Sequence, residues 1–316
     1  MTRYILRRLL ASAMVVLVVT VVIFLLIHAT SGDVLLAKLK QRIPPAQMQA
    51  LRHQIGLDQP LYRQYLTWFW NLLHGDLGKS MFRDQVTVWR RIRDAFPVTL
   101  ELTIFAMVSS MIISIPIGVL SAARQNTLID HLARFFSITG LAMPLFWLGT
   151  LVLVYGGKWF SYSPPTVYEQ FWHSPLHNLR QIWLPGLILG YNLSSISMRI
   201  TRSAVLEILR QDYVRTAFAK GLAERVVLIR HVLKNAIIPI LTVLGNQVVF
   251  LLGGTLIVEF LFHVPGLGFS AVEALSTRDY TMIQGLVFFL ALIIIAINLL
   301  IDISYARLDP RLRVGG

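Results

Sequence analysis

Residues 199–235 read RITRSAVLEILRQDYVRTAFAKGLAERVVLIRHVLKN, and eleven of these 37 residues are charged. Long apolar stretches border this segment on both sides, at 181–198 and 235–258. A charged side chain near the centre of a membrane-spanning helix costs about 3 kcal/mol, so burial of the whole segment in lipid would cost on the order of 30 kcal/mol. The segment must therefore stand in water or against protein, between two helices that cross a membrane.

The composition of the whole chain also indicates a membrane protein. Hydrophobic residues make up 55% of its 316 residues and charged residues 14%, and the mean hydropathy is +0.64. Soluble domains carry about 25% charged residues, and disordered chains are poor in apolar ones, so neither class fits. The absence of cysteine excludes disulfides, thiolate nucleophiles and cysteine-ligated zinc.

Six stretches are long and apolar enough to cross about 30 Å of hydrocarbon as helices, which takes about 20 residues each. They are 9–27, 102–123, 135–157, 181–198, 235–258 and 281–301. The expected fold is therefore all-α, a polytopic bundle of six transmembrane helices. Prolines within or at the start of these spans are expected to bend them, because proline frees a carbonyl group. These prolines are Pro116, Pro144, Pro185 and Pro239.

Lysine and arginine predict the orientation, because in short loops they favour the cytoplasmic side. With the N-terminus inside, the inner segments hold sixteen basic residues, whereas the two short outer loops, 158–180 and 260–280, hold three. Both termini are thus predicted to lie in the cytoplasm. Topology accounts for most of the formal net charge of +13, so no nucleic-acid partner is expected. The first apolar run is too long for a cleavable signal peptide.

The spans divide the chain into four predicted parts. Residues 1–29 form the N-terminal segment and first helix, 30–95 an extracytoplasmic region, 96–303 a five-helix core that includes 199–235, and 304–316 a cytoplasmic tail.

Residues 30–95 are expected to contain two short amphipathic helices. Met48, Leu51 and Ile55 recur at helical spacing, and a second apolar stripe follows. That stripe consists of Tyr62, Tyr65, Leu66, Phe69, Trp70 and Leu73. Its aromatic residues are typical of a helix that lies at the bilayer surface. A small cap over the outer mouth is a better interpretation than a dedicated ligand pocket.

The charged segment 199–235 has two apolar runs at helical spacing with Gly221 between them. The first run is Val205, Ile208 and Leu209, and the second is Val226, Val227, Ile229 and Val232. Because glycine commonly ends a helix, this pattern predicts a helix, a turn and a second helix. Such a projection has an apolar face and oriented cations, which suit the binding of a partner protein. Ala217 is small enough for close helix contact, and Arg215, Lys220 and Arg225 can pair with acidic groups.

Several motifs recur in order along nearly the whole chain. They are DYVRTAFAKG from Asp212, HVLKNAIIP from His231, RYILRR from Arg3, GLDQPL from Gly56, PLFWLG from Pro144, TRS from Thr201, GG from Gly253, PGLG from Pro265, RDY from Arg278 and LDPR from Leu308. Together they resemble the membrane subunits of binding-protein-dependent ABC importers, in the version found in dipeptide and oligopeptide permeases. The chain departs from the general signature at Arg215 and Thr216, where that signature has glutamate and alanine, and at Val34, where the family usually has proline.

The resemblance implies a type I ABC importer permease fold in the bacterial inner membrane. It implies four kinds of partner: a second similar permease, two ATP-binding subunits, an extracytoplasmic substrate-binding protein and membrane lipid. ATP and Mg²⁺ would be bound by the ATPase subunits, so no cofactor, metal or catalytic residue is expected in this chain. The cargo would be dipeptides or oligopeptides, with nickel chelates, glutathione and oligosaccharides as alternatives. The residues expected to couple to the ATPases are Asp212, Tyr213, Arg215, Thr216, Ala217, Lys220, Gly221 and His231.

Polar residues within spans are candidates for the substrate path, because an amide in lipid is costly unless it faces a cavity or a partner. These candidates are Asn192, Ser195, Asn246, Gln247 and Asn298. Neutral groups would let peptides of varied sequence pass, but hydrogen bonding between helices explains the same residues equally well. Glycines 245, 253 and 254 would let another backbone come close. Glu101 and Asp302 lie near predicted span ends, where interfacial or capping roles are expected, and Glu259 also lies at an outer end.

Other signals for a site in the chain itself are weak. The run Gly75-Asp-Leu-Gly78-Lys79-Ser80 resembles the end of a phosphate-binding loop, but only two residues separate its glycines where four are required. Pro175 interrupts the spacing of His173 and His177, and no HExxH or GxSxG motif is present. The rival from another class is an ion-gradient-driven transporter, but the mid-span regions hold no acidic residue for a coupling ion.

Overall fold

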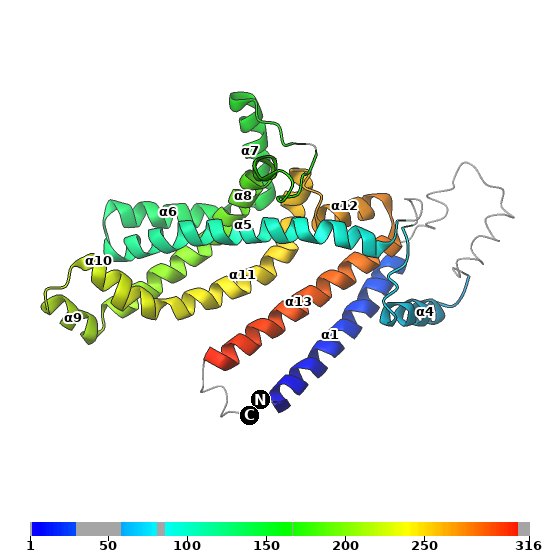
Figure 1. Ribbon diagram of the computed structural model, residues 1–316, viewed down its shortest axis with the longest axis horizontal. Helices are drawn as coiled ribbons and strands as arrows, with labels where there is room; N and C mark the ends of the chain where they lie inside the picture. The colour runs from blue at the N-terminus through cyan, green and yellow to red at the C-terminus, as the bar shows by residue number, and fades with distance from the viewer. Residues whose placement is uncertain (1, 30–57, 81–85, 166, 309–316) are drawn as a thin grey trace. The chain divides into compact units, whose positions relative to one another are not determined.

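The computed structural model describes residues 2–29, 58–80, 86–165 and 167–308. The regular secondary structure of these ranges is helical apart from an isolated antiparallel bridge between Lys79 and Thr87, so the predicted all-α class is confirmed. In chain order the helices are α1 (Thr2–Ala29), α4 (Leu61–Leu73), α5 (Val88–Ala123), α6 (Leu128–Ala142), α7 (Leu145–Phe160), α8 (Pro175–Leu209), α9 (Asp212–Ala219), α10 (Glu224–Val226), a π-helix (Val227–Leu233), α11 (Lys234–Leu261), α12 (Leu267–Thr277) and α13 (Tyr280–Leu308) (Figure 1).

The chain forms two compact units. One comprises residues 1–96 and 270–316, and the other comprises residues 97–269. The boundaries fall within α5, between Phe96 and Pro97, and within α12, between Phe269 and Ser270.

In the first unit, α1 and α13 lie side by side (Figure 1). The beginning of α5 packs on α13, where the side chain of Val88 occupies the space that a Cβ on Gly285 would need. Trp89 and Phe96 both meet Phe289 edge to face, with ring centroids 6.1 and 5.6 Å apart. Small and aromatic residues thus allow close helix contact without polar groups.

The predicted aromatic helix of the 30–95 region is confirmed as α4, which packs against α1. Phe24 of α1 meets Tyr65 and Trp68 with ring centroids 5.4 and 6.2 Å apart, and the hydroxyls of Thr20 and Tyr65 are 3.1 Å apart. The other predicted helix, around 48–55, lies outside the described residues.

Small residues hold α5 and α8 close together in the second unit. A Cβ on Gly190 would lie 2.7 Å from the Cβ of Ser109, and a Cβ on Gly118 would lie 2.8 Å from the Cβ of Thr201. A Cβ on Gly186 would collide with the ring of Phe105. Since lipid gives no hydrophobic drive between helices, such close packing is the main source of their association.

Two apolar clusters form the core of this unit. The central cluster consists of Val98, Leu102, Ala106, Ile182, Ile188, Leu189, Leu193, Leu251, Val258, Phe262 and Val264. The elbow cluster consists of Ala122, Ala204, Val205, Val214, Ala217, Val227, Val232, Ala236, Ile240 and Leu244. The elbow cluster joins α9 to α5, α8, the π-helix and α11.

The predicted count of six membrane-spanning helices is not reproduced among the described residues. Four described stretches are long and apolar enough to cross a membrane, namely Arg7–Ala29, Val88–Ala123, Glu224–Leu261 and Tyr280–Ile301. A fifth requires α6 and α7 together, and these are bent by 102°, so the predicted third span 135–157 is not one straight helix (Figure 1). Pro144 explains the break, because it lacks an N–H and disfavours the helical conformation at Met143, whose ψ is 120°. The other prolines predicted to bend spans remain inside continuous helices.

The predicted fourth span, 181–198, lies within α8 but is less apolar than these four stretches. Its polar side chains lower the apolar content, and the buried ones include Gln181, Ser194, Ser195 and Ser197.

The sequence predicts one turn in the segment 199–235, between two helices, but the structure has two turns there. The first apolar run belongs to the end of α8, the chain turns at Arg210 and Gln211, and α9 begins at Asp212. The predicted turn at Gly221 is confirmed, with φ of +76°. A π-helix then leads into α11.

Candidate coupling and substrate-path sites

The elbow formed by α9, the Gly221 turn and α10 is the first candidate site. Val214 and Ala217 of α9 are 0% and 6% exposed, and both belong to the elbow cluster. Val205 of α8 lies in the same cluster. The small side chain of Ala217 is therefore used for contact with the chain itself, and α9 is packed firmly against the end of α8.

The exposed side of the elbow carries large apolar side chains. Tyr213, Phe218, Leu222 and Val226 are 45%, 43%, 39% and 41% exposed. Phe218 and Leu222 are not among the predicted coupling residues. Their positions beside Gly221, within a charged segment, are the sequence signal that could identify them.

Charged groups surround this apolar surface. The carboxylate of Asp212 lies 3.5 Å from the guanidinium of Arg215, and both side chains are largely exposed. Such an exposed pair contributes little to stability. Lys220 and Arg225 are also exposed. The arrangement can therefore accept a partner surface that combines an apolar groove with acidic groups at its rim.

Hydrogen bonds connect α9 to the beginning of α11. The amide of Asn235 donates to the Tyr213 hydroxyl at 2.8 Å and to the carbonyl of His231 at 3.0 Å. Thr216 donates to the carbonyl of Asp212 within α9. His231 lies in the π-helix, a rare element that is frequent at functional sites. The structure thus brings Tyr213, Thr216 and His231 into one connected region.

Three predicted path residues lie in contacts between helices. The amide of Asn192 donates to the carbonyl of Gly140 at 2.9 Å, and Ser195 packs directly against Gly140. The amide of Gln247 donates to the carbonyl of Leu193 at 2.9 Å and accepts from the Ser197 hydroxyl at 3.1 Å. These groups attach α8 to α6 and to α11.

The other two predicted path residues lie outside these contacts, and Asn246 belongs to a partly exposed face of α11. Phe250, Ile257 and Phe260 are 56%, 40% and 47% exposed and share that helix face. Apart from its chain neighbours and the backbone of its own helix, no atom of the described residues lies within 4 Å of the position that a Cβ on Gly253 would take. Asn298 lies on α13.

A fully buried carboxylate, that of Glu259, lies at the end of α11. It accepts a hydrogen bond from the Thr99 hydroxyl at 2.7 Å and from the backbone N–H of Phe269 at 3.0 Å. The Thr99 hydroxyl in turn accepts from the N–H of Leu267 at 2.8 Å. Thr99 and Glu259 together therefore cap the first turn of α12, where helix N–H groups lack partners and favour negative charge.

This cap explains the glycines in the motif Pro265-Gly-Leu-Gly268. A Cβ on Gly266 would collide with the Glu259 carboxylate, and one on Gly268 would collide with the backbone of Leu256. The sequence places Glu259 at the outer end of a predicted span, but does not predict that it caps α12 from another helix.

A second acidic group anchors the described residues between α7 and α8. The Glu101 carboxylate accepts from the Tyr168 hydroxyl and from the Asn178 amide at 3.1 Å. Burial, together with the hydrogen bond to Glu101, raises the pKa of Tyr168 above its ordinary value. The phenol therefore stays protonated and acts as a donor. This network fixes the connection between α7 and α8.

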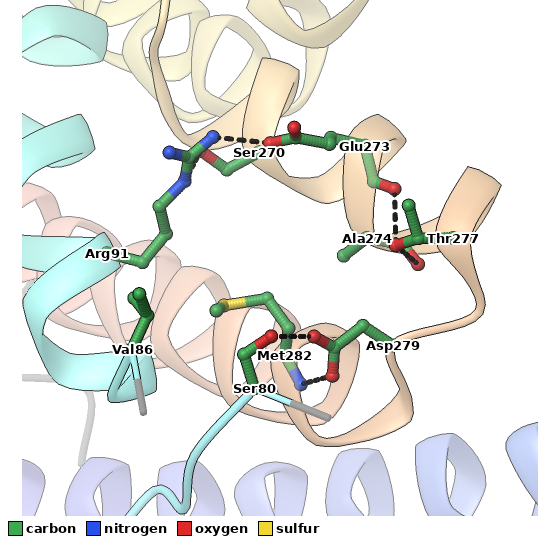
Figure 2. Close-up of a pocket in the computed structure, with 9 residues that line it drawn as sticks. All are labelled: Ser80, Val86, Arg91, Ser270, Glu273, Ala274, Thr277, Asp279 and Met282. Carbon is green, nitrogen blue, oxygen red and sulfur yellow. Dashed lines mark hydrogen bonds and ion pairs between the residues drawn. The ribbon is translucent and has the colours of Figure 1, made fainter. Parts of the chain in front are cut away.

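A small pocket in the first unit is not a substrate site. It has a volume of about 50 Å³ and is lined by Ser80, Val86, Arg91, Ser270, Glu273, Ala274, Thr277, Asp279 and Met282 (Figure 2). Arg91 pairs with Glu273 at 2.6 Å, and Asp279 accepts from the Ser80 hydroxyl and from the N–H of Met282. This volume holds a few water molecules and is too small for a peptide. Among the described residues, no three His, Asp or Glu side chains are grouped so that they could hold a metal ion.

Two protein families match the chain. The family described as the binding-protein-dependent transport system inner membrane component matches residues 114–314. The corresponding N-terminal family of membrane components matches residues 1–103.

Similar proteins extend over the same length. The dipeptide transport system permease protein DppB of Escherichia coli (strain K12) is 36% identical over 337 aligned positions, which cover 99% of both chains. A putative peptide transport system permease protein of Brucella abortus (strain 2308) is 36% identical over 313 positions, again covering 99% of both. DppB of Alkalihalophilus pseudofirmus is 35% identical and is covered completely.

A solved structure has a similar fold. The crystal structure of an amino acid ABC transporter with histidines aligns with a TM-score of 0.53 at 18% sequence identity, covering 69% of this chain and 94% of that one. At this identity the likeness concerns the fold alone.

Proposed function

Because the chain belongs to the family of binding-protein-dependent transport system inner membrane components, we propose that it moves dipeptides or short oligopeptides inward across the bacterial inner membrane. The observation that carries this proposal is the similarity to a dipeptide permease along 99% of both chains. Transport is driven by ATP hydrolysis in separate subunits, and this chain provides the membrane path.

The elbow is the proposed docking surface for an ATPase. Its exposed Tyr213, Phe218 and Leu222 supply apolar contact, and nearby cations pair with acidic groups on the partner. A second permease docks on the exposed face of α11, where Gly253 leaves room for another backbone and Asn246 faces the shared path. The complete importer then holds two permeases, two ATPases and an extracytoplasmic binding protein.

The packing of α9 suggests how work is transmitted. When the ATPase pair closes, it displaces the elbow, and Val214 and Ala217 transfer that displacement to α8 and α11 through the elbow cluster. Tilting of these helices switches the path between outward and inward access. Protein interiors resist compression, so a buried contact of this kind transmits displacement efficiently.

Copurification and reconstitution test the proposed function. The complex isolated through a tag on this chain is expected to contain an ATPase and a second permease, and to import peptide into liposomes only when ATP and the loaded binding protein are supplied. Accumulation of solute by this chain alone under a proton or sodium gradient would contradict the proposal. Mass spectrometry of the ligand on the binding protein distinguishes peptides from nickel chelates, glutathione and oligosaccharides.

The proposed orientation places α4 at the outer surface of the bilayer. Three faces of this helix differ: Tyr65 and Trp68 pack on α1, Leu66 and Trp70 are 58% and 63% exposed, and Asn71 lies on a polar face. The exposed apolar face of α4 is not the face that packs on α1, so we expect it to enter the bilayer interface.

Spin labels test this placement without background, because the chain contains no cysteine. A label at Leu66→Cys is expected to collide more with oxygen than with a water-soluble nickel chelate, and a label at the matched control Asn71→Cys is expected to show the reverse. Equal nickel accessibility at both positions would place α4 in water. Orientation is measured with a membrane-impermeant thiol reagent, which should label Ala219→Cys in right-side-out vesicles only after they are permeabilised.

A further inference from the structure

Asp130, near the beginning of α6, is a buried acidic residue with no role in the transport cycle proposed above. Its exposed fraction is 0%. One carboxylate oxygen accepts from Arg202 Nε at 2.8 Å and from the Ser121 hydroxyl at 2.6 Å. The other accepts from Arg202 Nη2 at 2.9 Å and from the backbone N–H of Asn126 at 3.0 Å. Arg134 approaches the same oxygen at 3.3 Å.

These contacts join three segments of the second unit. Ser121 lies in the last turn of α5, Asn126 lies in the connection to α6 with φ of +62°, and Arg202 lies in α8. The two parallel bonds from Arg202 fix both the distance and the angle between its guanidinium and the carboxylate. The α5–α6 hairpin is thereby attached to α8 in a single geometry.

Arg202 occupies the part of α8 that also contacts the elbow. Ala204 and Val205, two and three residues further along, belong to the elbow cluster together with Val214 and Ala217 of α9. The end of α8 is therefore held by the α5–α6 hairpin through an ion pair and by α9 through apolar contacts. Neither attachment extends into the surface that the elbow exposes.

We propose that Asp130 and Arg202 are positioning residues that make the α5–α6 hairpin move with α8 and α9 as one body when the ATPases close. This inference rests on the proposed function. A buried ion pair is often no more stabilising than apolar residues of the same volume, so its value here is the fixed geometry that it imposes. Without the pair, α9 would still move, but the hairpin would no longer follow.

The test uses the reconstituted complex and two substitutions, Arg202→Gln and Arg202→Lys. Glutamine removes the charge, whereas lysine keeps it but cannot form two parallel bonds. We expect peptide uptake per ATP hydrolysed to fall about tenfold in Arg202→Gln and less in Arg202→Lys. The matched control is Arg124→Gln, because Arg124 and Glu224 form an exposed pair at 3.8 Å in the same region. The control should keep the parent ratio.

A distance measurement separates positioning from mere stability. In the cysteine-free chain, spin labels at Leu128→Cys and Ala219→Cys report the separation of α6 and α9 within the assembled complex. In the parent this distance should be the same with and without ATP, whereas in Arg202→Gln it should change between the two states. An unchanged distance or an unchanged uptake ratio in Arg202→Gln overturns the proposal. Failure of both Arg202 variants to assemble also overturns it, because the pair would then serve folding alone.

The outcome is distinguishable from failure of the proposed function. If the parent complex imports no peptide, the proposed cargo is wrong, but the distance between the two labels still reports whether Arg202 keeps the hairpin and the elbow together.

Discussion

Replacement of Glu259 by alanine is expected to destabilise the protein strongly. The change removes the acceptor for the Thr99 hydroxyl, which is buried, and for the N–H of Phe269, which is partly buried. A buried donor left without a partner costs about 1–3 kcal/mol. The change also leaves the first turn of α12 without the side-chain oxygen that accepts from its backbone N–H. The loss of both contributions should lower the unfolding temperature of the purified complex by several degrees and reduce the amount that assembles.

This effect is measured by heating the complex in nanodiscs and determining the fraction that remains monodisperse at each temperature. Glu207→Ala on α8 is the matched control, because Glu207 makes no contact with the α12 cap and the same substitution there should leave the unfolding temperature unchanged. Glu259→Gln should give an intermediate loss, since the amide keeps one acceptor and places an NH₂ against the remaining donor. An unfolding temperature of Glu259→Ala equal to that of the control would show that α12 does not need this cap.

Gly268→Ala provides an independent check on the same site. The added Cβ would collide with the Leu256 backbone, which cannot move aside as the end of a flexible side chain can. Destabilisation by this substitution, with the carboxylate of Glu259 still present, would show that the glycine is required for the close approach of α12.

The spans that are predicted correctly are those whose evidence is local. The helices at 9–27, 102–123, 235–258 and 281–301 need only length and apolar content, and these remain the same whatever packs against them. Pro144 and Pro185 have the same local chemistry, yet the chain breaks at Pro144 and continues through Pro185. A proline removes one hydrogen bond and destabilises a helix interior by about 3 kcal/mol, so packing decides whether the helix survives. That packing cannot be predicted from one sequence.

The candidate sites likewise combine features that the local sequence predicts with features that depend on residues distant in sequence. Gly221 is predictable because a turn leaves a local signal, and Asn192, Ser195 and Gln247 are noticeable because polar residues are rare in spans. Their partners decide whether these polar residues line the substrate path or join helices by hydrogen bonds. The partner of Asn192 is Gly140 and that of Gln247 is Leu193, each about fifty residues away in sequence. The burial of Ala217 likewise depends on the other members of the elbow cluster, which determine the side of α9 that faces the chain.

The aromatic face of α4 shows what the composition of a segment can predict and what it cannot. The stripe from Tyr62 to Leu73 predicts a helix, and the helix is present. The sequence does not separate the residues that pack on α1 from those that remain exposed, because both groups are apolar. The partners of Tyr65 lie about forty residues earlier, at Phe24 and Thr20, so the distinction is a property of the folded chain.

Substitution of Gly221 by valine is expected to separate ATP hydrolysis from peptide transport. Gly221 has φ of +76°, and apart from its chain neighbours no atom that the structure describes lies within 4 Å of the position that its Cβ would take. The cost is therefore one of backbone conformation and not of space. An L-residue in this left-handed conformation is destabilised by about 1–2 kcal/mol, and a β-branched side chain by more.

A change of that size alters the population of the native turn by about five- to thirtyfold, since about 1.4 kcal/mol corresponds to a factor of ten. The turn closes α9, where the N–H of Gly221 donates to the carbonyl of Phe218 at 2.9 Å and the N–H of Leu222 to that of Ala217 at 3.4 Å. Loss of this cap changes the direction of Phe218 and Leu222, the exposed residues proposed to contact the ATPase. We therefore expect peptide-stimulated ATP hydrolysis in proteoliposomes to fall about tenfold in Gly221→Val.

Asparagine is the matched control, because its short polar side chain tolerates the left-handed conformation better than other residues do. Gly221→Asn should retain most of the stimulation by peptide and binding protein, and both variants should assemble in normal amounts because the position is open. If ATP hydrolysis is stimulated equally in the valine and asparagine variants, the turn does not orient the docking surface. In that case the coupling would depend on the packed side of α9, where Val214 and Ala217 meet the elbow cluster.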